Sequence, residues 1–516
     1  MNPRAPEWLP ELANLAALGW VPTIGMVRSA LVAAALVVAL LAASPAAAQP
    51  VLRLDGDRVE LRDDPHLPAL DLPSPPVSGM RSAGVRRAQV KRTVRGELAR
   101  LLAEGQIDQA THDSHRSTYN LARKSYKQLT GARKAGLGGA LENAELVAAS
   151  GQLTPSRLAP LFLTVARNRQ WWTTGPLLSN GQRVEFAGSE LVWQHYTGQG
   201  IQLQVLANFG KANGLWQAKD DDALRALLDE MLPLASDRDG ILAWEYWFRF
   251  GGGSPPWASG MAQATGVQAL ARAAVQLGEP AYRDAAIRAL ALFETPAPRG
   301  VRVDGEAGPH YLLYSFAPGL RVLNGFLQAV IGLHDAAELL AEPRAQALFE
   351  AGDTQARRET QLSDTGAWSL YSTGDDPAAG RESSLHYHRV VTDFLERLCD
   401  RVAAGEYCVA ADHFKAYEDI APVVRPLTRR VRAGKPANLR FVLSKVARVR
   451  LQVADGDRVV ATRTATVGYG KRSLAWTPRS PGTYELRATA ADLAGNDSVE
   501  RAIELEVLPP RPPKRR

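Results

Sequence analysis

Two short clusters of tyrosine and histidine carry the side chains that could exchange a proton with a ligand. His310, Tyr311 and Tyr314 precede a long apolar segment, and a His-Tyr-His run follows at residues 386–388. A phenol with a pKa of about 10 is an acid, and it becomes a base when a neighbouring cation lowers that pKa. Imidazole titrates near neutral pH. These clusters predict a site that binds a polar ligand and moves protons.

The segment 314–335 must position the first cluster. Pro318 suits the first turn of a helix, because that turn leaves its N–H groups unpaired. The apolar residues that then recur at helical spacing are Val322, Leu323, Phe326, Leu327, Val330 and Ile331. We therefore expect a helix over residues 318–340. Gly325 inside it costs about 1 kcal/mol relative to Ala, which predicts a close packing contact there.

This segment resembles the C-terminal domain of the glucuronyl C5-epimerases, which convert glucuronate to iduronate units within heparan-type polysaccharides. The resemblance covers residues 190–415, as several separated blocks in the family's order. The matching positions are Tyr196, Trp257, residues 261–263 (MAQ), Tyr314, residues 322–326 (VLNGF), residues 331–335 (IGLHD), residues 364–366 (DTG), Tyr371, Tyr387 and His388.

Epimerisation at carbon-5 removes a weakly acidic proton beside a carboxylate and replaces it from the opposite face. The reaction needs a base, an acid and groups that hold the carboxylate. The resemblance implies that Tyr314, Tyr371 and Tyr387 are the acid–base group. The arginines expected to neutralise the carboxylate are Arg321, Arg381 or Arg389, and the other substrate-binding positions are His310, His388, Tyr196, Trp257, Gln263 and Asn324.

The sequence departs from the family at two places. Leu312 and Leu313 stand where the family has a pair of Glu, and Gly374 stands where it has an Arg. Glu306 or His310 could replace the missing carboxylate. Two alternatives to an epimerase therefore stay open. One is a uronate polysaccharide lyase, in which the same carbanion collapses by β-elimination with Tyr and His. The other is a non-catalytic carbohydrate-binding protein of the envelope.

Composition places the chain among multidomain globular proteins. Its 516 residues are 46% hydrophobic and 22% charged, with a net charge of +7. That charge favours polyanions, although a solvated basic face has the same composition. We expect an acidic polysaccharide as partner and no nucleic acid, and a homodimer stays open. The sequence contains no phosphate-binding loop, dinucleotide fingerprint or metal-ligand spacing, so we expect no cofactor and no metal.

Residues 1–48 are expected to be a leader and signal peptide. Arg28 precedes an uncharged run at residues 30–43, and residues 44–48 (SPAAA) give an A-x-A cleavage pattern. We predict cleavage after Ala48, a secreted or cell-envelope location, and no stable membrane insertion after cleavage. An uncleaved segment would instead anchor the protein in the membrane. In an exported protein the two cysteines, Cys399 and Cys408, are expected to form a disulfide.

Changes in residue pattern divide the remaining chain into expected segments. The expected divisions are a linker at 49–80, a helical N-terminal subdomain at 81–170, an epimerase-like helical domain at 171–420, a β domain at 425–508 and a disordered tail at 509–516. Paired helices predict an (α/α) toroid-like arrangement in the second helical region. Short alternating strands separated by turns after residue 425 predict an immunoglobulin-like β-sandwich. The predicted fold class is thus multidomain and mainly α, with a C-terminal β-sandwich.

Overall fold

The computed structural model describes residues 49–68, 92–402 and 405–511. The predicted leader and signal peptide, most of the second half of the predicted linker and the last five residues lie outside this description. Among the described residues, no helix combines the length and the apolar character that crossing a bilayer requires.

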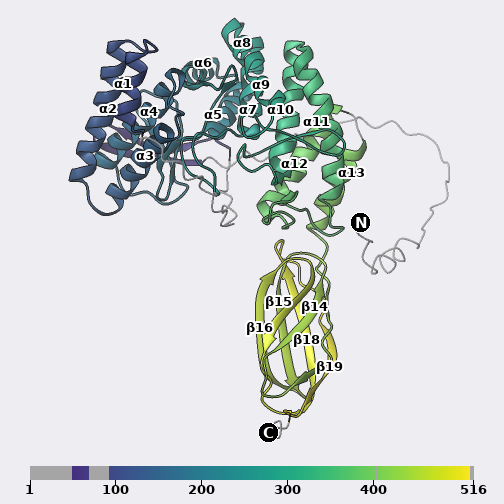
Figure 1. The fold of residues 1–516 in the computed structure, drawn as a ribbon. Helices are drawn as coiled ribbons and strands as arrows, with labels where there is room; N and C mark the ends of the chain where they lie inside the picture. Colours follow the sequence, from purple (N-terminus) through teal and green to yellow (C-terminus); the bar gives the residue numbers. More distant parts are fainter. Residues whose placement is uncertain (1–48, 69–91, 403–404, 512–516) are drawn as a thin grey trace, which may run out of the picture. The chain divides into compact units, whose positions relative to one another are not determined.

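Four helices follow one another in the region predicted to be a helical N-terminal subdomain (Figure 1). They are α1 (Val94–Ala103), α2 (Gln109–Gln128), α3 (Gly131–Ala149) and α4 (Pro155–Thr174). The side chain of Thr93 caps α1 by accepting from the N–H of Gly96, and Asp108 caps α2 in the same way. Their apolar faces bury residues such as Leu98 and Leu161 in the main core.

A five-stranded sheet lies beside these helices, and it corrects the prediction of a linker at 49–80. Its order is β2-β1-β3-β4-β5, from β1 (Gln49–Asp55), β2 (Arg58–Asp64), β3 (Arg183–Phe186), β4 (Trp193–Tyr196) and β5 (Gly200–Leu203). Gly56, at φ +59°, closes the β1–β2 hairpin. β1 then pairs in parallel with β3. Apart from Pro50 in β1, the prolines of this range begin at Pro65, after β2 has ended.

The second helical region follows the sheet. Its helices are α5 (Val205–Ala218), α6 (Asp221–Met231), α7 (Gly260–Leu277), α8 (Pro280–Ala289), α9 (Ala291–Glu294), α10 (Leu323–Leu340), α11 (Pro343–Leu362), α12 (Leu385–Val402) and α13 (Gly405–Tyr417). Between them lie a short 3-10 turn (Leu232–Leu234) and the short strands β6 (Ser236–Asp237), β7 (Leu242–Ala243), β8 (Arg302–Asp304), β9 (Pro309–Tyr311), β10 (Arg321–Val322) and β11 (Ser372–Thr373).

Two glycines let α10 pack closely. A Cβ on Gly332 would lie 2.5 Å from the carbonyl oxygen of Ala264 on α7, so only glycine permits this helix contact. A Cβ on Gly325 would meet the side chain of Leu313 at 3.0 Å. The packing contact that the sequence predicts at Gly325 is therefore present.

The helix predicted from Pro318 begins instead at Leu323. Residues Arg321 and Val322 form β10, which pairs antiparallel with β11. The N–H of Leu323 then donates to the carbonyl of Tyr371 at 3.1 Å. Because these backbone groups bond to a distant segment, they are not available to an earlier helical turn. The pairing also fixes Tyr371 against the start of α10.

A buried ion cluster joins three helices of this region. Asp335 on α10 accepts from Arg272 on α7 at 2.8 Å and from Arg401 on α12 at 2.7 Å. Burial opposes ionisation, but hydrogen bonds from His334 and Arg401 and the charges of the two arginines hold the pKa of Asp335 well below its usual value. One carboxylate on α10 therefore binds a guanidinium group from α7 and another from α12.

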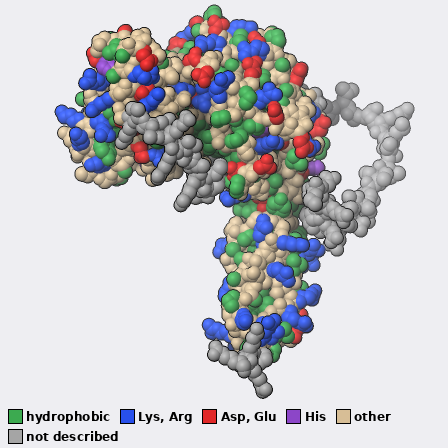
Figure 2. All heavy atoms as spheres, viewed as in Figure 1, with side chains coloured by type: hydrophobic (Ala, Val, Ile, Leu, Met, Phe, Trp, Pro, Cys, Tyr) green, Lys and Arg blue, Asp and Glu red, His purple; other side chains and the backbone are tan. Residues whose placement is uncertain are grey.

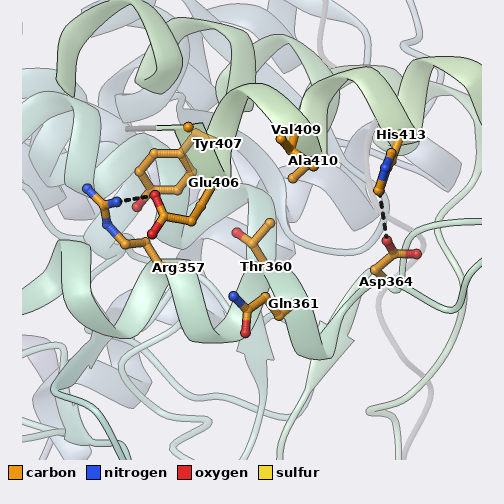
Figure 3. Close-up of a pocket in the computed structure, with 10 residues that line it drawn as sticks. Arg357, Thr360, Gln361, Asp364, Glu406, Tyr407, Val409, Ala410 and His413 are labelled. Atoms are coloured by element: carbon orange, nitrogen blue, oxygen red, sulfur yellow. Dashed lines mark hydrogen bonds and ion pairs between the residues drawn. The ribbon is translucent and has the colours of Figure 1, made fainter. Parts of the chain in front are cut away.

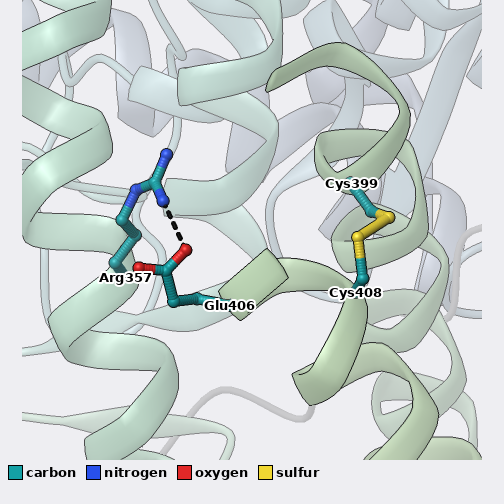
Figure 4. Close-up of a disulfide and its surroundings, with 4 residues drawn as sticks. All are labelled: Arg357, Cys399, Glu406 and Cys408. Atoms are coloured by element: carbon teal, nitrogen blue, oxygen red, sulfur yellow. Dashed lines mark hydrogen bonds and ion pairs between the residues drawn. A yellow bond between two sulfur atoms is a disulfide. The ribbon is translucent and has the colours of Figure 1, made fainter. Parts of the chain in front are cut away.

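The predicted disulfide between Cys399 and Cys408 is present and joins α12 to α13 (Figure 4). Near it, Arg357 on α11 forms an ion pair with Glu406 at 2.7 Å. The start of α13 is thus held by one covalent bond to α12 and one ionic contact to α11.

The C-terminal residues form two sheets with a core of their own (Figure 1). Their strands are β12 (Val424–Pro426), β13 (Arg430–Arg432), β14 (Ala437–Leu443), β15 (Ala447–Asp455), β16 (Arg458–Val467), β17 (Gly470–Trp476), β18 (Gly482–Asp492) and β19 (Arg501–Leu508). One sheet has the order β12-β14-β17 and the other β13-β19-β18-β15-β16. Alternate residues such as Phe441, Val449 and Leu486 fill the core, which is the period-two pattern of the sequence.

Asp335→Ala should lower the free energy of unfolding by about 3 kcal/mol, because two buried guanidinium groups lose their shared carboxylate. Chemical denaturation followed by circular dichroism measures this change. Asp393→Ala on α12 is the matched control, since Asp393 pairs with Arg397 at side-chain exposures near 50%. Exposed pairs contribute about 0–1 kcal/mol, so an equal loss in the two variants would contradict a structural role for the buried cluster.

Candidate active site

Tyr314, Tyr371 and Tyr387, here called the tyrosine cluster, come together in the second helical region. The hydroxyl of Tyr314 hydrogen-bonds to the hydroxyl of Tyr371. The rings of Tyr371 and Tyr387 lie edge to face with centroids 5.0 Å apart. Phenolate charges on Tyr371 and Tyr387 would both repel one on Tyr314. Three hydroxyl groups from three segments therefore share one site.

Backbone hydrogen bonds hold these tyrosines in position. Tyr314 lies in the loop between β9 and β10, where the N–H of Ser315 donates to the carbonyl of Ala258 at 2.9 Å. The N–H of Tyr371 donates to the carbonyl of Arg381 at 2.8 Å. Tyr387 lies in the first turn of α12, and its N–H donates to Ser384 Oγ at 3.3 Å.

Burial determines the acidity of the cluster. It raises the pKa of Tyr314 well above its usual value, and the charges of the other two tyrosines raise it further. Burial also raises the pKa of Tyr371 to about 12, whereas the hydrogen bond from Tyr314 lowers it. Both phenols are protonated at neutral pH, and Tyr371 is the one whose phenolate receives a hydrogen bond. Tyr371 is thus the phenol of the pair that ionises more readily.

An aromatic wall surrounds Tyr314 and includes two of the predicted substrate-binding residues. The ring of Trp257 lies 5.9 Å from that of Tyr314, and its indole N–H donates to the carbonyl of Phe248. Phe250 lies 5.6 Å from Tyr314 and 6.2 Å from Tyr196. Phe248 and Phe250 were not among the predicted site residues. The density of aromatic residues at 243–250 is the sequence signal that could have identified them.

Three predicted substrate-binding residues have structural partners instead. His388 is fully buried; its Nε2–H donates to the carbonyl of Phe414 at 2.7 Å, and its ring stacks on Trp368. Arg389 is exposed and pairs with Glu418 at 2.7 Å. Gln263 accepts from the N–H of Trp244 and donates to the carbonyls of Leu242 and Ala289. These three side chains are engaged with other parts of the protein, and their role in substrate binding stays a prediction.

His310 and Arg321 meet at a buried carboxylate. His310 Nδ1 lies 2.9 Å from Glu359, and Arg321 lies 3.9 Å from the other oxygen of that carboxylate. The guanidinium of Arg321 also donates to the carbonyl of Asp304. Both residues are therefore engaged with Glu359 and its neighbours, while His310 Nε2 is buried without a partner among the described residues.

The other predicted positions differ in burial. Arg381 contributes its backbone carbonyl to Tyr371, and its side chain is exposed. Asn324 is buried at the start of α10, and its Oδ1 has no hydrogen-bond partner in the described part of the chain. Leu313, at a position where the family has Glu, is buried with Leu312. Glu306 is exposed and pairs with Arg358, so it does not supply the missing carboxylate.

A pocket of about 420 Å³ lies elsewhere, between α11 and α13 (Figure 3). The charged residues on its walls are already paired. Arg357 binds Glu406 at 2.7 Å, and Asp364 lies 3.9 Å from His413 and accepts from the hydroxyl of Tyr417. The tyrosine cluster does not line this pocket. The charged groups of this pocket are therefore less available to a ligand than the hydroxyl groups of the tyrosine cluster.

Comparison with known proteins relates this region to one family. Residues 238–415 match the family model of the D-glucuronyl C5-epimerase C-terminus. A D-glucuronyl C5-epimerase from Caenorhabditis elegans is 35% identical over 130 residues, which are 23% of this chain and 21% of that protein. The match thus spans about a fifth of the curated relative. The whole tyrosine cluster lies within the segment that is similar to the family model.

Similar solved structures are more distant. Cellobiose 2-epimerases from Spirochaeta thermophila and Bacillus thermoamylovorans align with TM-scores of 0.33 and 0.34 at 15% and 8% identity, over 55% and 56% of this chain and 72% and 75% of theirs. An endo-beta-1,4-glucanase from Acetobacter xylinum aligns with a TM-score of 0.30 at 13% identity, over 41% of this chain and 73% of that one. At these scores the likeness supports no argument about fold or activity.

His388→Ala should lower the free energy of unfolding by about 2 kcal/mol at pH 7, because buried partners of both ring nitrogens lose their hydrogen bonds. Burial lowers the pKa of His388, so the unfolded chain binds a proton at that residue more readily as pH falls below about 6.5. The stability that the neutral imidazole gives the wild type is then partly lost. The difference in the free energy of unfolding between the His388→Ala variant and the wild type should therefore be smaller at pH 5 than at pH 7. Denaturant titration at the two pH values measures it.

His413→Ala is the control for this experiment, because the His413 side chain is 58% exposed. It should change stability by less than about 0.5 kcal/mol at either pH. A His388→Ala protein as stable as this control would show that His388 is not a structural residue.

Proposed function

We propose that this protein is an enzyme that exchanges the carbon-5 proton of uronate units in an acidic polysaccharide, as a C5-epimerase does. One observation carries the proposal. The Tyr314–Tyr371 hydrogen bond lies beside Tyr387, inside the segment that is similar to the epimerase family model. We further propose export of the mature chain from Gln49, an (α/α) toroid-like arrangement of the helices and an immunoglobulin-like arrangement of the C-terminal sheets.

The proposed reaction assigns one role to each tyrosine. The Tyr371 phenolate oxygen takes the proton from carbon-5, and the electron pair of the broken C–H bond moves into the carboxylate as an enolate. The Tyr387 hydroxyl then gives its proton to the opposite face of carbon-5. Tyr314 donates a hydrogen bond to the Tyr371 oxygen and so favours its phenolate. Proton exchange with water afterwards restores Tyr371 to phenolate and Tyr387 to phenol.

Charge distribution supports a polyanionic partner. The described β domain at 424–511 contains 17 Lys and Arg against 8 Asp and Glu. Figure 2 shows many of these basic side chains on the surface of the strands. A basic surface attracts an acidic polymer at a distance.

The lyase alternative stays open. It requires a histidine close to tyrosine; His388 is held by Ser369 and Phe414 and His310 by Glu359, but the ring of His386 lies 5.4 Å from that of Tyr387. The non-catalytic alternative does not explain why three phenols, two of them with a raised pKa, meet at one site. The epimerase, the lyase and the non-catalytic protein each predict a different result in the carbon-5 exchange assay.

Tyr387→Phe should reduce carbon-5 exchange at least 100-fold, because only the hydroxyl that returns the proton is lost. The assay incubates residues 49–516 with a glucuronate-containing polysaccharide in deuterated water and measures deuterium at carbon-5 by mass spectrometry. Polymer binding and the melting temperature should stay unchanged. Unsaturated ends without exchange would identify a lyase, and binding without either reaction would identify a non-catalytic protein.

Tyr282→Phe is the matched control for this substitution. Tyr282 is a buried tyrosine on α8 whose hydroxyl donates to Asp229 at 2.8 Å, away from the tyrosine cluster. The Tyr282→Phe variant should exchange the carbon-5 proton at the same rate as the wild type. Equal losses in the two variants would attribute the effect to general destabilisation.

The exchange rate should rise with pH between about 7 and 9.5. The pKa of Tyr371 is raised to about 12, so the fraction of its phenolate increases about tenfold per pH unit in this range. A plot of log kcat/KM against pH should therefore have a slope near +1, and Tyr314→Phe should lower the rate at every pH because Tyr371 loses its donor. A bell-shaped profile with a maximum below pH 7 would exclude Tyr371 as the base.

A further inference from the structure

Buried polar atoms without partners gather on one face of the five-stranded sheet. Arg183 on β3 is 6% exposed, and neither of its terminal nitrogens has a hydrogen-bond partner among the described residues. Gln194 on β4 and Gln202 on β5 are 2% and 1% exposed, and each leaves one side-chain atom unpaired, Nε2 and Oε1 respectively. Unpaired buried polar groups are rare in native proteins, so their grouping indicates a ligand.

The strand register makes these three residues neighbours. Arg183 lies opposite Gln194, and Gln194 lies opposite Gln202. Residues directly across from each other point to the same face, with their Cβ atoms about 5 Å apart. The other face carries Val184 and Trp193, which belong to the main hydrophobic core. Arg183, Gln194 and Gln202 therefore form one row, here called the polar row.

The polar row leads towards the tyrosine cluster. Tyr196 lies two residues after Gln194 on β4 and so shares its face. A charge on Tyr196 would interact with Arg183 on one side and with Tyr314 on the other. The ring of Phe250 lies between Tyr196 and Tyr314, at 6.2 Å and 5.6 Å. One residue thus links the polar row to the proposed acid–base group.

The charge of Arg183 is incompletely balanced by the protein. Burial lowers the pKa of its guanidinium, although Tyr196 and Asp64 act in the opposite direction. Asp64 itself lies 3.3 Å from Lys211, which also pairs with Glu185 and Glu190. The nearby carboxylate is therefore shared with another cation. A buried cation in this condition is stabilised when an anion binds to it.

We propose that the polar row binds the carboxylate and an adjacent hydroxyl of a uronate unit. Arg183 would hold the carboxylate through its two terminal nitrogens, in the paired geometry that a guanidinium forms with a carboxylate. Gln194 Nε2 would donate to a ligand oxygen, and Gln202 Oε1 would accept from a sugar hydroxyl. The choice of uronate rests on the proposed function.

Calorimetric titration of the 49–516 chain tests the proposal with a glucuronate-containing polysaccharide and with the same polymer after reduction of its carboxyl groups to alcohols. The wild type should bind the carboxylate form at least tenfold more tightly. Arg183→Met should remove most of this preference and leave binding of the reduced polymer unchanged, because only the attraction of the basic β domain for the polyanion then remains. Arg183→Lys should regain only part of the preference, because an ammonium lacks the two-nitrogen fork.

Arg157→Met is the matched stability control. Arg157 is also buried, but its guanidinium donates to Glu245 at 2.7 and 2.9 Å. Its loss should lower the melting temperature by roughly 6 °C or more, because it leaves Glu245 with one partner fewer. Arg183→Met should leave the melting temperature unchanged or raise it. A fall as large as that of Arg157→Met would assign Arg183 to a structural role and overturn the proposal.

The binding assay tests the polar row and the exchange assay tests the proposed function, so each proposal can be refuted without the other. A carboxylate preference that depends on Arg183, without carbon-5 exchange, would support the polar row and refute the epimerase function. Exchange with the same KM in the wild type and in Arg183→Met would support the enzyme and overturn the polar row as the carboxylate site. Equal loss of both polymers in Arg183→Met would also overturn it, because the recognised group would not be the carboxylate.

Discussion

The candidate site depends on a backbone pairing only two residues long in each strand. Arg321 and Val322 pair with Thr373 and Ser372, and the carbonyl of Tyr371 accepts from the N–H of Leu323 at the start of α10. The N–H of Asp376 adds a bond to the carbonyl of Gly319 at 3.1 Å, so the loop carrying Tyr314 and the loop carrying Tyr371 are anchored to each other. The N–H of Tyr371 then bonds to Arg381, in the segment that leads into α12 and Tyr387. The hydroxyl groups meet because the main chains are held together first.

Burial raises the pKa of two phenols in the tyrosine cluster, and a phenolate there therefore needs a group that stabilises its charge. A phenol removed from water is harder to ionise, and neighbouring phenols make it harder still, so the cluster by itself favours the protonated form. A base at this position needs a nearby cation or a hydrogen bond to its oxygen. Tyr314 supplies the hydrogen bond. Among the predicted arginines, Arg389 is paired with Glu418, Arg321 contacts Glu359, and the side chain of Arg381 is exposed.

The buried charges of the helical scaffold are paired with each other, unlike the polar atoms of the polar row. Asp335 satisfies two arginines at once and joins α7, α10 and α12, while the disulfide joins α12 to α13. Charges in the scaffold are thus paired within the protein, as buried charges usually are. The polar row on the sheet is the contrasting case, because its donors and acceptor are buried and unpaired. This difference separates groups that stabilise the fold from groups that are available to a ligand.

The sequence alone determined most helices and the period-two strands of the β domain, because these depend on local periodicity. The three tyrosines came from the family resemblance, and the disulfide came from the two cysteines of a chain expected to be exported. The sequence did not determine that α10 starts at Leu323 or that residues 49–64 form strands, since both depend on partners distant in the chain. It placed His388 and Gln263 in the site although their side chains are satisfied in the core. It also overlooked Arg183, whose position opposite Gln194 and whose unpaired nitrogens exist only once β3 and β4 have paired. Only tertiary structure decides which polar groups burial leaves without a partner.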